Sequence, residues 1–168
     1  MDQDEVRRLF EYDAETGVMR NRVFRNPKAL KGEVAGTINR SLNCRQVCVN
    51  YQVQYVHRLI WIYAHGPIPA SMSIDHINGD PTDNRLVNLR LATHLQNMRN
   101  VKRPTHNTSG YKGVSWHRRD RRWRAQIKTG KVTKFLGNFT SKEEAASAYN
   151  MAAQRMFGEF ARLNEVTN

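Results

Sequence analysis

Cysteine is scarce in this chain, which has only Cys44 and Cys48 among its 168 residues. Two cysteines cannot build a disulfide scaffold, and so low a number is typical of proteins from a reducing compartment. A zinc site would require two further ligands close to this pair, and none stands out in the sequence around them. We therefore interpret both cysteines as ordinary strand or loop residues rather than as metal ligands.

Long apolar runs are also missing. The longest candidate, residues 59–64, is far shorter than the roughly 18 residues that a membrane helix requires. The first five residues are acidic and lack the basic and apolar regions of a signal peptide. The sequence therefore predicts no membrane partner and a cytoplasmic location.

Acidic residues are outnumbered by basic ones. The chain contains 27 Lys and Arg against 15 Asp and Glu, which gives a formal net charge of +12, and residues 105–168 hold 12 of the basic residues but 5 acidic ones. Basic side chains displace counterions from nucleic-acid phosphates, so this excess indicates a polyanionic partner. Solubility alone is the alternative explanation, but the crowding of charge in the C-terminal third favours nucleic acid.

The apolar residues, 39% of the chain, recur with the periods of both helices and strands, which predicts an α+β fold. Polar residues and a proline over 101–109 indicate a linker between domains 1–100 and 110–168. In the first domain we expect helices over 2–10, 57–65 and 93–99, and strands over 18–22, 45–49, 53–56, 74–77 and 89–92. In the second we expect three antiparallel strands, 111–117, 122–128 and 133–136, packed on a helix that ends near Phe157. Ser141, with Glu144 three residues later, predicts a capping box at the start of this helix.

Four polar residues could carry chemistry: Asp75, His76, Asn88 and Asn97. A hairpin followed by a helix can bring the amide oxygen of Asn97 over the strand that carries Asp75. One carboxylate and one amide oxygen suit Mg²⁺, which keeps waters that phosphate oxygens can replace. His76 could take a proton from an attacking water, because imidazole titrates near neutral pH. Taken singly, each residue could stabilise a turn or lie on the solvated surface. Together at these spacings they favour a nuclease.

The same region closely resembles the HNH endonucleases of the phage and intron-encoded homing type. The matching stretches are 56–60 (VHRLI), 75–80 (DHINGD), 84–90 (NRLVNLR) and 93–97 (THLQN), and the resemblance covers roughly residues 5–100. It implies an N-terminal ββα-metal nuclease domain in the cytoplasm of a phage-infected bacterial cell. By this match Asp75 and Asn97 would bind one divalent metal ion and His76 would be the general base. Asn88 would brace the loop between the strands through backbone hydrogen bonds and so orient His76.

Two histidines near this motif leave alternatives open. Many HNH endonucleases carry His where this chain has Asn97, and Asn favours Mg²⁺ or Mn²⁺ over zinc. His94, one turn earlier, stays an alternative ligand. His57 could orient the site or contact DNA, although packing at the edge of the core is the commoner role of a histidine that begins a helix.

The predicted C-terminal sheet is apolar on one face and basic on the other. Trp123, Ala125 and Ile127 alternate with Arg, Gln and Lys, and residues 118–124 contain five arginines. A three-stranded sheet can lie in the major groove of double-stranded DNA and present such side chains to base edges and phosphates. A solvated basic face is the alternative, which the density of arginine disfavours.

This second domain resembles the AP-two DNA-binding domain of plant ethylene-response factors over about residues 109–163. The matching stretches are 109–114 (SGYKGV), 123–127 (WRAQI), 135–139 (FLGNF) and 143–149 (EEAASAY). The resemblance implies that Lys112, His117, Arg119, Arg124, Gln126, Lys128 and Phe135 face DNA. The plant domains typically carry Arg at the position of Ser115 and Trp at that of Phe135, so their target sequence does not carry over.

The sequence therefore predicts an HNH endonuclease that hydrolyses a phosphodiester bond of double-stranded DNA with one Mg²⁺ or Mn²⁺ ion, while its C-terminal domain sets the position on DNA. One active site per chain predicts a nick by a monomer, and a dimer induced by DNA would be needed for a double-strand break. The alternative is a non-enzymatic DNA-binding regulator with a vestigial nuclease fold.

Overall fold

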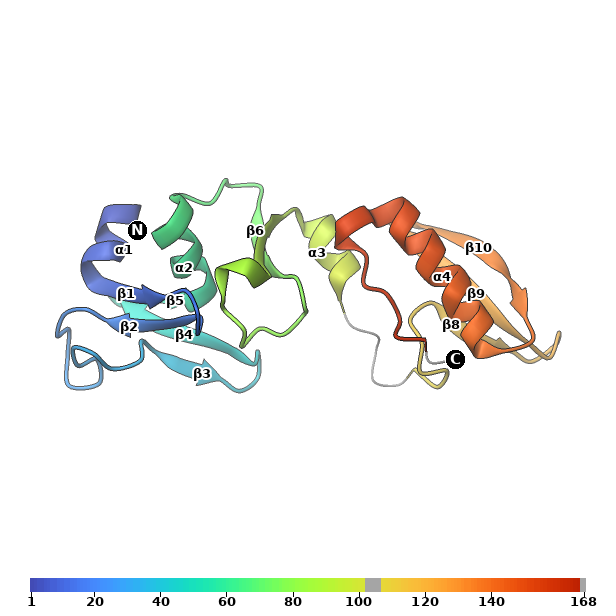
Figure 1. Ribbon diagram of the computed structural model, residues 1–168, viewed down its shortest axis with the longest axis horizontal. Coiled ribbons are helices and arrows are strands. Elements are labelled where there is room, and N and C mark those ends of the chain that lie inside the picture. Colours follow the sequence, from blue (N-terminus) through green and yellow to red (C-terminus); the bar gives the residue numbers. More distant parts are fainter. Residues whose placement is uncertain (102–106, 167–168) are drawn as a thin grey trace. The chain divides into compact units, whose positions relative to one another are not determined.

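The computed structural model describes residues 1–101 and 107–166, and the chain divides into two compact units, Met1–His94 and Leu95–Asn168 (Figure 1). Helices and small antiparallel sheets occur in both units, so the predicted α+β class is confirmed. The division falls at the start of α3 (His94–Asn100), earlier than the domain limit that we predicted at residue 100. The predicted linker, 101–109, lies partly outside the described residues, and its limits stay a prediction.

The first unit folds around a single core. The helix α1 (Gln3–Leu9) runs into the hairpin of β1 (Phe10–Asp13) and β2 (Val18–Asn21). A second sheet has the order β3 (Thr37–Asn39), β4 (Cys44–Val49) and β5 (Gln52–Tyr55), and β5 leads directly into α2 (Val56–His65). The centre of the core consists of fully buried apolar side chains from these elements: Val6, Phe10, Met19, Val56, Leu59 and Ile60.

The strands β1 and β3 are the elements that the sequence did not reveal. We predicted a helix through residue 10, but α1 ends at Leu9 and Phe10 is already extended and completely buried. Burial of the Phe10 ring against the core therefore overrides local helix propensity. The strand β3 has only three residues and no buried side chain, so it carries no alternation that a pattern could detect.

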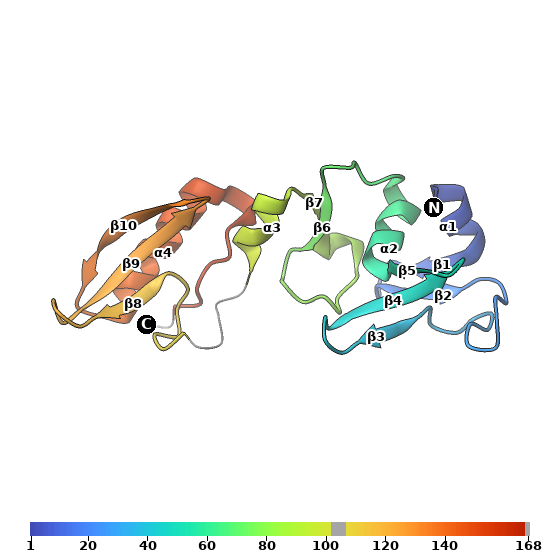
Figure 2. The same ribbon diagram turned by 180° about the vertical axis from the view of Figure 1, so that it is seen from behind.

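The hairpin of β6 (Ser73–His76) and β7 (Leu89–Ala92) completes the first unit, with a short 3₁₀ turn, Leu86–Asn88, before the return strand (Figure 2). Both strands occur where the sequence predicts them. Within the described residues, 1–101 and 107–166, every helix is too short or too polar to cross a membrane.

The second unit contains α3 and a three-stranded sheet covered by one helix. The sheet has the order β10 (Val132–Phe139), β9 (Arg122–Thr129) and β8 (Val114–His117), and α4 (Lys142–Phe157) lies along one face (Figure 1). The alanines of α4, with Tyr149, pack on Ala125 and Ile127 of β9. The predicted capping box is present, because Ser141 accepts a hydrogen bond from Glu144 N while the Glu144 carboxylate accepts one from Ser141 N. A 3₁₀ turn, Gly158–Phe160, follows the helix.

Gly113 sets the close approach of α4 to this sheet. It has φ +76°, and a Cβ at this position would overlap the ring of Tyr149 and the carbonyl of Gln126. We expect Gly113→Ala to lower the free energy of unfolding by about 3 kcal/mol, because a left-handed backbone and an overpacked contact both become unfavourable. Gly110→Ala is the matched control, since Gly110 has φ +82° but open space around it, and it should cost about 1 kcal/mol. Equal losses in urea titrations of the two variants would contradict the packing argument.

Candidate active site

Asp75 lies on β6 directly opposite Arg90 on β7, and the two side chains form a buried ion pair. The Nε and one terminal nitrogen of Arg90 donate hydrogen bonds to the same carboxylate oxygen, Oδ2, at 2.9 and 2.8 Å. The two side chains are only 5% and 12% exposed. A charge-assisted pair of this kind fixes the carboxylate of Asp75 on the hairpin.

His76, the next residue, is held by Asn84. The Nε2 atom of His76 lies 3.0 Å from Oδ1 of Asn84, and both side chains are buried. An amide oxygen only accepts hydrogen bonds, so Nε2 carries the proton in this contact and Nδ1 is the ring nitrogen that can act as a base. Asn84 was absent from our predicted site residues because a polar residue between Asp83 and Arg85 has the pattern of an ordinary loop. Its place in the matching stretch 84–90 was the available signal.

The segment that carries Asn84 is anchored by the N-terminal hairpin. The hydroxyl of Tyr12, on β1, donates to the carbonyl of Asn84 at 3.2 Å and accepts from the backbone N–H of Leu86 at 3.0 Å. Gly17, with φ +73°, lies so close to the backbone at residues 84–85 that a side chain there would overlap it. The strand that the sequence did not reveal, β1, therefore helps to position the partner of His76.

Asn88 ties together the two ends of the loop between β6 and β7. Its side-chain amide donates to the carbonyl of Asp83 at 2.8 Å and to Oδ1 of Asn78 at 3.1 Å, and its Oδ1 accepts from Asn78 N at 2.9 Å. Its own carbonyl accepts from Ile77 N at 2.8 Å. These bonds restrain the backbone that follows His76.

His57 brings a second imidazole to the site. It lies in the first turn of α2, and its ring meets the ring of His76 edge to face, with centroids 5.1 Å apart and an interplanar angle of 79°. The ring of Tyr55 stacks on His57 at 5.5 Å. The structure thus gathers Asp75, His76 and Asn88 with two partners, Asn84 and His57, that were not among the predicted site residues.

Asn97 and His94 lie on α3, at whose start the two compact units divide. The C-terminal end of this helix is held within the second unit. The ammonium of Lys112 donates to the carbonyls of Arg99 and Val101 at 2.6 and 2.7 Å, and the Arg99 guanidinium lies 4.7 Å from the centre of the Phe157 ring. Burial lowers the pKa of Lys112 to about 8.

A metal ion at this site would be bound with few protein ligands. The described part of the chain contains no cluster of three or more His, Cys, Asp or Glu side chains arranged to hold a metal. A set of one carboxylate and one amide oxygen suits Mg²⁺ or Mn²⁺, which retain water ligands, and does not suit zinc. Asp75 and Asn97 lie in different units, so their role as ligands of one hard cation stays a prediction.

The face of the C-terminal sheet turned away from α4 carries most of the residues predicted to contact DNA. Arg124, Gln126 and Lys128 alternate with the buried Ala125 and Ile127. Other members of this face are Phe135, which pairs with Gln126 and has the Arg124 guanidinium 5.6 Å from its ring centre, and His117, which pairs with Arg122.

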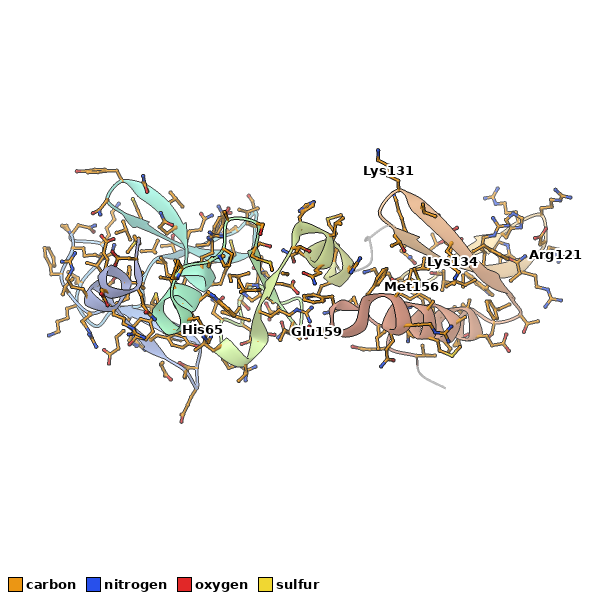
Figure 3. The ribbon with its side chains drawn as sticks, turned by 90° about the horizontal axis from the view of Figure 1, so that it is seen from above. His65, Arg121, Lys131, Lys134, Met156 and Glu159 are labelled. Carbon is orange, nitrogen blue, oxygen red and sulfur yellow. The ribbon has the colours of Figure 1, made fainter. Side chains whose placement is uncertain are left out.

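The two turns of this sheet extend its positive charge. Arg119 and Arg121 lie in the turn between β8 and β9, and Lys131 lies in the next turn; Arg121 and Lys131 point away from the body of the unit (Figure 3). Lys112 differs from the rest of the predicted set, because its ammonium is engaged with the end of α3 rather than placed on the sheet face.

Comparison with known proteins identifies the family. The model of the HNH endonuclease family matches residues 54–99, the segment that contains α2, the β6–β7 hairpin and most of α3. Protein 3.8 of Escherichia phage T7 is 38% identical over 115 residues, which cover 67% of this chain and 92% of that protein. The chain contains an HNH endonuclease domain over residues 54–99. An HNH endonuclease of Acanthamoeba polyphaga mimivirus, L560, is 34% identical over 112 residues, which cover 66% of this chain and 57% of the mimivirus protein.

The C-terminal region of this chain is similar to part of several plant transcription factors. The rice AP2-like ethylene-responsive transcription factor CRL5 is 44% identical over 62 residues, which cover 36% of this chain but 9% of that protein. Dehydration-responsive element-binding protein 2C of Arabidopsis thaliana is 42% identical over 69 residues, or 39% of this chain and 20% of the plant protein. No solved structure shows a significant match.

Proposed function

We propose that this protein hydrolyses phosphodiester bonds of double-stranded DNA with a divalent metal ion, and that His76 is its general base. The observation that carries the proposal is the buried imidazole of His76, held at Nε2 by Asn84, one residue from the carboxylate of Asp75. A histidine whose basic nitrogen is defined by a neutral partner is suited to accept a proton from water near neutral pH.

Each group at the candidate site has a separate role in the proposed reaction. Nδ1 of His76 takes a proton from water as the water oxygen forms a bond to phosphorus. The bond from phosphorus to the 3′-oxygen breaks in line with this attack, and the leaving 3′-oxygen takes a proton from solvent. Asp75 and Asn97 would hold the metal ion, which when bound supplies positive charge against the phosphate as negative charge grows there. Arg90 keeps the Asp75 carboxylate in place for that role, and Asn88 keeps the loop that follows His76 in shape.

The exposed face of β8, β9 and β10 would bind DNA and so position the nuclease domain on it. Arg124, Gln126 and Lys128 form a polar row on the central strand, with side chains of the types that contact base edges and phosphates. Partial similarity of this region to plant AP2-like transcription factors supports the same role. A monomer with one active site would cut one strand of the duplex and leave a nick.

A plasmid assay tests the proposed activity. Supercoiled plasmid, or phage genomic DNA if the plasmid lacks a site, is incubated with the full chain and Mg²⁺, Mn²⁺ or EDTA. We expect conversion to open circle with either metal and none with EDTA. Linear product at early times would contradict the single-strand mechanism, and retained binding without cleavage on both DNAs would favour a DNA-binding regulator.

Arg124 provides a test of the DNA-binding face. We expect Arg124→Ala to weaken binding to a DNA fragment about tenfold and to reduce the dependence of binding on salt, because a cation on the central strand is lost. Arg155→Ala is the matched control, since it removes the same exposed charge from α4, which packs on the other face of the sheet. Equal weakening by the two substitutions, measured by fluorescence anisotropy at several salt concentrations, would contradict this assignment.

A further inference from the structure

His57 is fixed in place by the helix that carries it. It is the second residue of α2, and three apolar residues of the same helix, Val56, Leu59 and Ile60, are at most 1% exposed. The helix therefore cannot shift without disturbing the core of the unit. A side chain in its first turn has a defined position relative to β6.

The ring of His57 packs against the rings of His76 and Tyr55. It meets His76 edge to face at 5.1 Å, and Tyr55 stacks on it with an interplanar angle of 21°. Perpendicular ring pairs at this separation are a favourable geometry. His76 is consequently restrained at two points, by the hydrogen bond from Nε2 to Asn84 and by the ring of His57.

His57 is uncharged at neutral pH. Burial chiefly lowers its pKa to about 4, and the neighbouring His76 and Arg58 act in the same direction. A neutral ring makes no ion pair with a DNA phosphate, so direct phosphate binding does not explain its position. A neutral His57 also adds no positive charge beside His76.

We propose that His57 is a positioning residue that holds the imidazole of His76 in the orientation required for proton abstraction. The proposal rests on the role of His76 proposed above and adds a residue to that site. The hydrogen bond to Asn84 holds Nε2 of His76, and the packed ring of His57 further restricts rotation of the His76 ring about its Cβ–Cγ bond. A base displaced by a fraction of an ångström accepts the proton from water less effectively. Loss of His57 should therefore lower the rate of the chemical step rather than weaken DNA binding.

Two substitutions distinguish the packing of the His57 ring from any role of its nitrogen atoms. We expect His57→Ala to lower kcat for plasmid cleavage about tenfold with Mg²⁺, while KM and the Kd for DNA stay within twofold of the original chain. His57→Phe keeps an aromatic ring in the same place and should retain at least half of kcat. An unchanged kcat in His57→Ala would overturn the proposal, and so would an equal loss in both variants, which would assign the effect to a nitrogen atom.

A nuclear magnetic resonance measurement tests the orientation without relying on cleavage. The two ring ¹⁵N resonances of His76 are widely separated when one tautomer is held by Asn84, and the separation narrows when the ring is released. We expect the full separation in the original chain and in His57→Phe, and a narrower one in His57→Ala. An equal separation in the original chain and His57→Ala would overturn the proposal. A chain that cleaves no DNA but shows the expected narrowing would reject the proposed nuclease function while supporting the contact.

Discussion

His76→Ala should lower the rate of metal-dependent DNA cleavage by a factor of about 10² to 10⁴, the usual range for a general base. DNA binding should be unchanged, because the side chain of His76 is buried in the β6–β7 hairpin and its hydrogen-bond partner is Asn84 rather than solvent. Single-turnover cleavage of supercoiled plasmid measures the rate, and fluorescence anisotropy with EDTA present measures the binding.

The control for this substitution is His65→Ala. His65 lies at the last position of α2, its ring packs on Trp61, and it belongs to the same unit without contacting the candidate site. We expect cleavage by His65→Ala to stay within twofold of the original chain. Cleavage at the original rate by His76→Ala would show that another group activates the water.

The hydrophobic pattern was sufficient to predict most of the framework of the site. The alternation at 74–77 and 89–92 predicted the hairpin, and the helical spacing at 57–65 predicted α2, because each element buries a regular apolar face. The capping box at Ser141 was equally visible, since it depends on residues three positions apart.

The partners of His76 could not be predicted in the same way. Asn84 and His57 are 8 and 19 positions away in the sequence, and they reach His76 only through the loop and the core packing of α2. Tyr12 lies 72 residues before Asn84 and contacts it through a strand that showed no clear pattern. Local sequence signals report periodicity and caps, whereas contacts of this kind depend on how distant elements pack.

Asp75→Asn should abolish tight metal binding and lower the cleavage rate by a factor of about 10³, because an amide is a weaker ligand than a carboxylate and the metal stabilises charge in the transition state. The loss can be measured from the electron paramagnetic resonance signal of free Mn²⁺ during titration of the chain. His76→Ala should bind Mn²⁺ like the original chain, so the two substitutions separate the metal from the base. Binding of Mn²⁺ by Asp75→Asn with the original affinity would show that Asp75 is not a ligand.

Stability must be controlled in this comparison, because Asp75→Asn also leaves the guanidinium of Arg90 buried without its carboxylate. Breaking a buried ion pair costs about 3 kcal/mol, so part of any loss of activity could come from unfolding. Arg90→Gln breaks the same pair from the other side but keeps the Asp75 carboxylate. We expect both variants to lose similar stability without metal, and only Arg90→Gln to regain it as Mg²⁺ replaces the guanidinium as the cationic partner. Thermal unfolding is measured with and without Mg²⁺. An equal shift of the unfolding temperature by Mg²⁺ in the two variants would argue against a metal at Asp75.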